Sequence, residues 1–294
     1  MQRATGCDQL RADGDTRGAV PVFGGDDVSL LEQTLFGDVD KVQIAIDRIR
    51  FHAEMMRAKG VRVVLAFSGG KDSCVIDELV TMSGIECERF YNYVGIDPPE
   101  LVAFIREHYS HVEFKRPPIP FFAKMVSKHF PPMRRQRYCC EVLKEYHGDG
   151  MVITGVRWDE SSRRSKRKMF EPCKKKPDLF FLQPIIDWTT DDVWSFIRAR
   201  CIPYCSLYDE GFKRLGCILC PMTSNENRMI EARRWPKFVG AWKAAFKRLI
   251  AARAEAGKEP IRYGKTSDEL FDWYTGQFQP DNSDDDQQCF RFED

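Results

Sequence analysis

The chain has 294 residues, of which 43% are hydrophobic and 30% charged, and its formal net charge at pH 7 is +1. This composition allows a sizeable core and excludes a fibrous or wholly disordered protein. No run of about 18 apolar residues exists and the N-terminus has no apolar signal core, so we expect a cytoplasmic protein without a membrane span. Its eleven cysteines should then stay reduced, which favours metal or redox chemistry over disulfides.

Charge is distributed unevenly along the chain. Residues 1–40 and 281–294 each carry a net charge of −5, which leaves +11 for the rest of the chain. A basic body between acidic ends suits a polyanionic ligand, and a solvated surface with solubilising tails is the alternative. We predict a loosely ordered acidic segment (1–40), a main domain (41–222), a helical extension (223–280) and a flexible acidic tail (281–294).

The predicted elements alternate between helices and strands after one short helix near Leu30–Leu35. In chain order they are a helix over 41–59, a strand over 61–67, a helix from 71, a strand over 89–94, a helix over 98–109, a strand over 111–115, a helix over 121–130, strands over 151–156 and 180–182, and a helix over 189–197. Such alternation predicts an α/β fold with a doubly wound, mostly parallel sheet.

Beyond Cys220 the chain is predicted to be helical. An apolar stripe recurs there at helical spacing, and we assign it to the core rather than to a ligand site. The stripe consists of Trp235, Phe238, Trp242, Phe246 and Ile250. The fold therefore carries a helical C-terminal extension.

A glycine turn joins the strand over 61–67 to the next helix. Its residues are Ser68, Gly69, Gly70, Lys71, Asp72 and Ser73. Two glycines let backbone N–H groups approach a phosphate, and the helix start adds unpaired donors and positive potential. Lys71 supplies a cation. An ordinary strand-to-helix turn is the alternative, but ligands of parallel sheets bind where this turn lies, at the carboxyl end of a strand.

The turn resembles the S-G-G-x-D-S signature of the adenine-nucleotide alpha-hydrolase (PP-loop) superfamily. Within it, residues 61–222 resemble the phosphoadenosine phosphosulfate (PAPS) and adenosine phosphosulfate (APS) reductases. Further segments follow in that family's order: Gly95–Glu100, Ile153–Arg157 with Asp159–Ser161, Pro184 with Asp187–Thr189 and Asp191–Trp194, Ile202–Tyr204, Leu207–Phe212, and Gly216-Cys217. The resemblance implies a Rossmann-like domain of the alpha-hydrolase type.

The same resemblance implies the ligand and its contacts. The turn is expected to bind ATP, APS or PAPS, with Mg²⁺ if the nucleotide is ATP. Lys71 and Arg157 are then candidate catalytic residues. Gly155, Arg157, Ser161 and Arg164 join the glycine turn as candidate nucleotide contacts, because relatives contact phosphosulfate in this segment.

Four cysteines form the pattern C-C…C-x-x-C and are candidate metal ligands. They are Cys139, Cys140, Cys217 and Cys220. Four thiolates suit zinc or an iron–sulfur cluster. Adjacent cysteines reach one zinc ion only with strain, whereas a 4Fe–4S cluster offers each a separate iron, and APS-type reductases carry this pattern. We therefore favour the cluster, with zinc and unmetallated thiols as alternatives.

Residues 163–176 hold eight lysines and arginines among fourteen positions. A solvated loop is one interpretation, and a phosphate-facing lid is the one we favour. The charge exceeds what one nucleotide needs, so a nucleic-acid or nucleoprotein partner is a further expectation. DNA phosphorothioation enzymes and CRISPR-associated proteins are relatives of this kind.

The C-terminal tail bears on the reaction. Reductases of the family end in E-C-G-x-H, whose cysteine attacks the sulfate sulfur, whereas this chain has Cys289 followed by Phe290 and Arg291. We therefore favour a nucleotide-activating sulfur-transfer enzyme. The alternatives are a true APS or PAPS reductase that uses Cys289 and a reductant such as thioredoxin, and a non-catalytic accessory that binds nucleotide or nucleic acid.

Overall fold

The computed structural model describes residues 29–35, 37–144 and 149–277. These residues form two compact units whose segments alternate along the chain. The first unit takes the described residues up to 93, residues 97–116 and residues 149–216. The second takes residues 94–96, 117–144 and 217–277. The sequence predicts four consecutive segments, which differ in kind from these two interleaved units, and that prediction remains untested.

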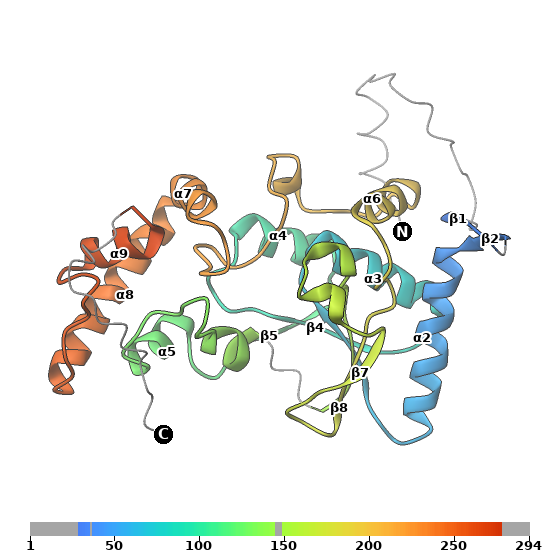
Figure 1. The fold of residues 1–294 in the computed structure, drawn as a ribbon, viewed down its shortest axis with the longest axis horizontal. Helices are drawn as coiled ribbons and strands as arrows, with labels where there is room; N and C mark the ends of the chain where they lie inside the picture. Colours follow the sequence, from blue (N-terminus) through green and yellow to red (C-terminus); the bar gives the residue numbers. More distant parts are fainter. Residues whose placement is uncertain (1–28, 36, 145–148, 278–294) are drawn as a thin grey trace. The chain divides into compact units, whose positions relative to one another are not determined.

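A six-stranded sheet is the centre of the first unit (Figure 1). Its strand order is β5-β4-β3-β6-β8-β7, and all neighbours pair in parallel except the edge strand β7. The strands are β3 (Val63–Phe67), β4 (Glu88–Asn92), β5 (Glu113–Lys115), β6 (Gly150–Ile153), β7 (Phe170–Pro172) and β8 (Leu179–Leu182). The central strands are the most apolar, and every residue of β6 is buried.

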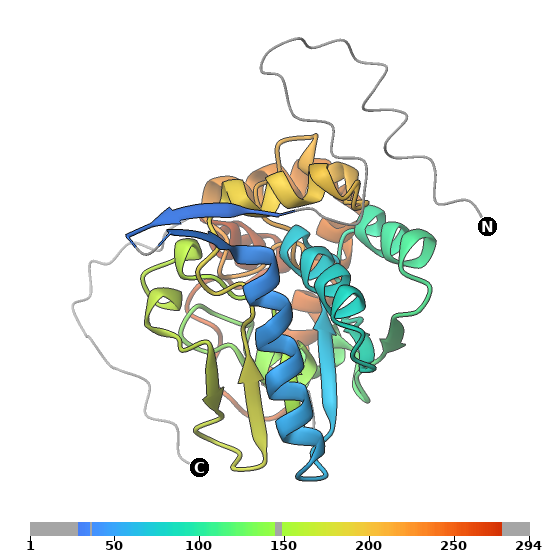
Figure 2. The same ribbon diagram turned by 90° about the vertical axis from the view of Figure 1, so that its right-hand side faces the viewer.

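Helices connect and cover these strands. They are α2 (Lys41–Arg57), α3 (Lys71–Ser83), α4 (Pro99–His108) and α6 (Thr190–Ala199). Figure 2 shows α2 and α3 side by side in front of the sheet. The chain proceeds from β3 outward to β4 and β5, and then returns to β6 on the other side of β3. The sheet order thus reverses between β3 and β6, which is the place where such sheets bind ligands.

The segment before α2 is a β-hairpin, so the short helix predicted near Leu30–Leu35 is wrong. Strands β1 (Leu31–Thr34) and β2 (Gly37–Asp40) pair antiparallel. Gly37 has a positive φ of 112°, which suits a turn, and the side chains of β1 are exposed. A helix here would have had no neighbouring element against which to bury its leucines, since the side chains of this segment are exposed, and the glycine turn allows the strands to pair instead.

The second unit is helical, as the predicted C-terminal extension requires. Its helices are α5 (Phe121–Ser127), α7 (Asn225–Arg234), α8 (Pro236–Glu255) and α9 (Ser267–Thr275). Trp242 and Phe246 of α8 are fully buried. Figure 1 shows α7, α8 and α9 gathered together. A short π-helical turn, η1 (Cys140–Lys144), precedes the gap in the described residues and was not predicted, whereas α9 lies within the predicted helical extension 223–280.

The predicted fold class is confirmed: the sheet is mostly parallel, helices flank it, and a helical part follows. The basic segment is less irregular than predicted, because it contains the 3-10 turn η3 (Arg164–Lys166) and the edge strand β7. Within the described residues, no helix is long and apolar enough to cross a membrane.

Candidate functional site

The glycine turn brings the end of β3 to the start of α3. Gly69 has a φ of +72°, and a Cβ atom there would lie 2.7 Å from Cδ1 of both Leu101 and Ile105. Gly70 is the N-cap of α3 and provides no side-chain cap. The first N–H groups of such a helix can donate to an anion, which the helix dipole also attracts. The turn therefore has the chemistry of a phosphate site.

Ser68 and Ser73 maintain the shape of the turn. The Ser73 hydroxyl donates to the Gly70 carbonyl at 2.8 Å, and it accepts from the Ser68 amide at 3.2 Å. The Gly70 amide in turn donates to Ser68 Oγ at 3.3 Å. Both hydroxyls thus hold the backbone, and their predicted contact with a nucleotide stays a prediction.

Tyr208 places its hydroxyl at the start of α3. The Lys71 amide donates to Tyr208 Oη at 2.9 Å, and the Tyr208 ring packs edge-on against Trp194 with centroids 5.3 Å apart. Burial raises the pKa of Tyr208, so the hydroxyl is neutral at physiological pH. No role was predicted for Tyr208. The sequence feature that could have indicated one is the position of Tyr208 in segment 207–212, which resembles the reductase family.

Buried charges join the turn to the loop after β6. Lys71 is 6% exposed, and its Nζ lies 2.9 Å from Asp72 Oδ2. Arg157 is 1% exposed, and its Nε donates to Asp72 Oδ1 at 2.7 Å. The Arg157 guanidinium also donates to the Trp188 carbonyl at 3.2 Å and lies 3.4 Å from Asp159 Oδ2. The two candidate catalytic residues, Lys71 and Arg157, thus share one carboxylate.

Two other candidates lie beside the pair of Asp72 and Arg157. A Cβ atom on Gly155 would lie 3.0 Å from the Asp72 backbone, so a glycine permits this close approach. Arg164 forms an ion pair with Glu160, whose carboxylate accepts from the Arg157 amide at 3.0 Å. The nucleotide contacts proposed for these residues stay predictions.

The predicted contact Ser161 lies on the surface beside this group. Its carbonyl accepts from the Arg164 amide at 2.8 Å. Part of the positive charge of segment 163–176 is neutralised by neighbouring acids, since Arg167 pairs with Glu171 as Arg164 does with Glu160. Ser161 and the basic segment are therefore neighbours, as the sequence implies, and the contact of Ser161 with a nucleotide stays a prediction.

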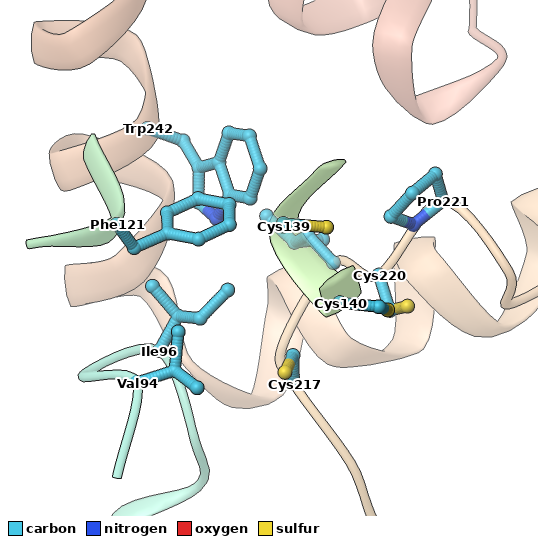
Figure 3. Close-up of a pocket in the computed structure, with 10 residues that line it drawn as sticks. Val94, Ile96, Phe121, Cys139, Cys140, Cys217, Cys220, Pro221 and Trp242 are labelled. Carbon is cyan, nitrogen blue, oxygen red and sulfur yellow. The ribbon is translucent and has the colours of Figure 1, made fainter. Parts of the chain in front are cut away.

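The four candidate metal ligands line one pocket of the second unit (Figure 3). The pocket has a free volume of about 20 Å³, roughly the room of one water molecule. Its other lining residues are apolar or aromatic: Val94, Ile96, Phe121, Leu219, Pro221 and Trp242. Cys139 and Cys217, which are 78 positions apart in the chain, thus line the same pocket, and the role of the four cysteines as metal ligands stays a prediction.

The loop between Cys217 and Cys220 is fixed from two sides. Leu219 has a positive φ of 59°, an unusual conformation for a bulky residue. Its amide donates to Glu231 Oε2 of α7 at 2.6 Å, and its carbonyl accepts from the Tyr274 hydroxyl of α9 at 3.1 Å. These contacts stabilise a bend that the sequence of the loop does not favour, and no local sequence pattern predicts them.

The thiols of the pocket affect one another. A hydrogen bond with Cys140, burial, and the charges of Cys217 and Cys220 raise the pKa of Cys139. The four groups therefore become thiolates together only where a bound cation compensates their charge. Among the described residues, no three His, Cys, Asp or Glu side chains form a group that could hold one metal ion. Cys289 lies outside the described residues.

Comparisons with known proteins show which family and which proteins this chain is similar to. A family model described as phosphoadenosine phosphosulfate reductase domain matches residues 62–223. An uncharacterized protein of Methanocaldococcus jannaschii is 28% identical over 68% of this chain and 51% of its own length. Another from that organism is 30% identical over 69% of this chain and 45% of its own length. The chain thus spans about half the length of these two relatives.

Adenosine 5'-phosphosulfate reductase 2 of Bacillus subtilis is 28% identical over 61% of this chain and 80% of the reductase. Among solved structures, PAPS reductase from Candida auris aligns with 15% identity and a TM-score of 0.43, over 58% of this chain and 93% of that one. A likeness this distant supports no statement about function.

Proposed function

Because the chain belongs to the phosphoadenosine phosphosulfate reductase domain family, we propose that it is a cytoplasmic nucleotide-binding enzyme of sulfur metabolism or sulfur transfer. It binds ATP or a sulfonucleotide at the glycine turn and acts at the linkage of the α-phosphate. The observation that carries this proposal is the glycine turn at the start of α3, where the N-cap residue Gly70 has no side chain and Lys71 is held in place by Asp72. That arrangement suits a nucleotide phosphate.

With ATP, an oxygen of the acceptor attacks the α-phosphorus. The bond between that phosphorus and the oxygen that bridges it to the β-phosphate breaks. Pyrophosphate leaves and the acceptor becomes adenylated, and Mg²⁺ bound with the ATP would neutralise part of the phosphate charge. The amides of the turn and Lys71 stabilise the negative charge that develops on the phosphates. Asp72 and Arg157 orient Lys71 for this task, since they form one buried chain of charges. Arg157 in this scheme acts through Asp72, and a direct contact with the nucleotide is the alternative role.

The B. subtilis relative favours a second candidate, APS or PAPS reduction. There the Cys289 thiolate attacks the sulfate sulfur, the sulfur–oxygen bond to the nucleotide phosphate breaks, and the adenosine phosphate leaves. A dithiol such as thioredoxin then attacks the Cys289 sulfur, which releases sulfite and leaves a disulfide on the reductant.

The four cysteines are proposed to hold a 4Fe–4S cluster. The donor set fits such a group, because the side chains around the pocket supply only sulfur, carbon and one indole nitrogen. A bound cluster would supply positive charge and a one-electron couple. The pocket has room for about one water molecule, so its side chains would have to move to admit a cluster.

The experiment is to incubate the purified protein separately with ATP, APS and PAPS. Pyrophosphate release supports nucleotide activation, and sulfite release that depends on a thiol and is lost in Cys289→Ser supports the reductase. Lys71→Ala should lower turnover by a factor on the order of 10²–10³, as loss of one preorganised charge contact does. Lys59→Ala, which removes an exposed lysine in the turn after α2, should leave turnover unchanged. No binding of any of the three nucleotides would contradict the proposal.

The same assay tests the alternative that the protein is a non-catalytic accessory, which predicts nucleotide binding without turnover. The comparisons lend no support to a nucleic-acid partner, and two arginines of segment 163–176 are paired with acids. Binding to DNA or RNA that weakens steeply with salt would revive that partner. Binding that is absent or independent of salt would remove it.

A further inference from the structure

Helix α8 carries positive charge on its exposed side. From residue 232 to residue 254 the chain has seven basic residues and no acidic one. Lys243 pairs with Asp268 of α9 at 2.6 Å, but three other basic side chains of α8 are exposed and form no ion pair with another described residue. We call these three the basic face of α8: Lys237, Lys247 and Arg248.

The helix does not offset the charge of this face itself. Basic residues on a helix surface are stabilised by acids three or four positions away, and no acid stands at those positions around any of the three. The first turn of α8, which contains Lys237, has no acidic residue either, although the N-terminal end of a helix attracts negative charge. Negative charge from outside the helix would therefore stabilise this face.

The C-terminal end of the chain carries charge of the opposite sign. Residues 281–294 hold six acids and one arginine, and three of the acids are consecutive, Asp284–Asp286. This acidic tail lies outside the described residues. A basic helix face and an acidic segment attract each other through complementary charge without needing a shaped pocket.

The acidic tail begins close to α8. Tyr274 of α9 stacks on Trp242 of α8 with ring centroids 4.9 Å apart, and the described chain ends three residues later at Gln277. The nine residues from Gln277 to Asp286 span up to about 30 Å when extended. The basic face lies within about 9 Å of Trp242 along the helix axis, at a rise of about 1.5 Å per residue. The three aspartates can therefore reach the basic face of the same molecule.

We propose that the acidic tail binds the basic face of α8 in the same molecule, with Asp284–Asp286 against Lys237, Lys247 and Arg248. The contact consists of exposed ion pairs, so it is reversible and weakens as salt screens the charges. It closes this face to other polyanions at low salt. The inference depends neither on the reaction nor on a bound metal, and both partners lie outside the matched family domain.

The first test is crosslinking of the full chain with a carbodiimide, which joins a carboxylate directly to an amine in contact with it. Peptide mass spectrometry should find Asp284–Asp286 linked to Lys237 or Lys247, and the links should disappear in about 1 M salt. Lys258 is the matched control, because it is an exposed lysine just beyond the end of α8. Links to Lys258 as abundant as those to the basic face would overturn the proposal.

The same experiment on a mixture of ¹⁵N-labelled and unlabelled chains separates two occupants of the face. Links within one isotopic form only are expected. Links that join the tail of one form to the lysines of the other mean that the tail binds a second copy, and they overturn docking within one molecule.

The second test is competition by a peptide of residues 278–294 that carries a neutral dye, measured by fluorescence anisotropy. The full chain with Asp284→Asn, Asp285→Asn and Asp286→Asn should bind the peptide more tightly than wild type, because its own tail no longer competes. Adding Lys237→Gln, Lys247→Gln and Arg248→Gln should weaken that binding by a factor of about 3–100, the effect of three exposed ion pairs.

Equal affinities of wild type and the asparagine variant for the peptide would contradict the proposal. So would an oligonucleotide that binds wild type through the three basic residues while the peptide binds neither protein, since the face would then serve a nucleic acid.

Discussion

Gly69 and Gly60 provide a matched pair of single residues. Their φ angles are +72° and +70°, but an added Cβ atom meets two side chains at Gly69 and nothing within 4 Å at Gly60. Gly60→Ala should cost about 1 kcal/mol, the penalty of a left-handed alanine. Gly69→Ala should cost about 1–3 kcal/mol and also weaken nucleotide binding, because the turn must move away from α4. Denaturant unfolding and calorimetric titration measure both effects, and equal losses of binding would contradict this account.

Arg157 and Asp72 are expected to act as one unit. Arg157 is almost completely buried, whereas the Asp72 side chain is 19% exposed, so the loss of either partner leaves the other in a poor environment. A double-mutant cycle with Arg157→Lys and Asp72→Asn should give a coupling energy of about 1–3 kcal/mol in unfolding experiments. Additive effects would mean that Arg157 does not work through Asp72 and would favour its direct contact with a nucleotide.

At the scale of elements, two C-terminal helices complete the cysteine site. The loop from Cys217 to Cys220 belongs to the matched family domain, but the groups that fix Leu219 come from α7 and α9, beyond it. The backbone of Leu219 is in a left-handed conformation that leucine disfavours, so these two hydrogen bonds stabilise it. The helical extension is thus a part of the site and not an appendage.

Glu231 of α7 should make stability depend on pH. Burial raises the pKa of this carboxyl from 4.5 to about 7. The folded protein therefore binds the proton more tightly, and the free energy of unfolding should fall as pH rises between these two values. Glu231→Gln keeps an acceptor for the Leu219 amide but cannot titrate, so a contribution on the order of 3 kcal/mol should vanish from the pH dependence.

Urea unfolding at about pH 5 and about pH 7 measures this difference. Glu226→Gln is the control, since Glu226 is an exposed carboxylate in the first turn of the same helix. The control should keep the pH dependence of wild type. A pH dependence in Glu231→Gln equal to that of wild type would contradict the prediction.

At the scale of the molecule, the sequence predicts what local pattern and sheet topology determine. The strand, glycine turn and helix around Gly69 are consecutive, so their order alone places the turn at the ligand-binding edge of the sheet. Tyr208, Glu231 and Trp242 reach their sites through contacts distant in the chain. Trp242 packs in the core, as the apolar stripe predicts, but helical periodicity does not indicate that this side chain also lines a pocket.

Each of the two candidate sites lies within one unit, so the two ligands should protect different parts of the chain. The glycine turn and Arg157 belong to the first unit, and the four cysteines and Trp242 to the second. Hydrogen exchange with peptide resolution should therefore show that nucleotide protects 68–73 and 155–161, whereas iron loading protects 217–220 and α8. Protection arises because a ligand lowers the population of locally open states of the segment it contacts. If nucleotide alone protected 217–220, the assignment of the two ligands to separate units would be wrong.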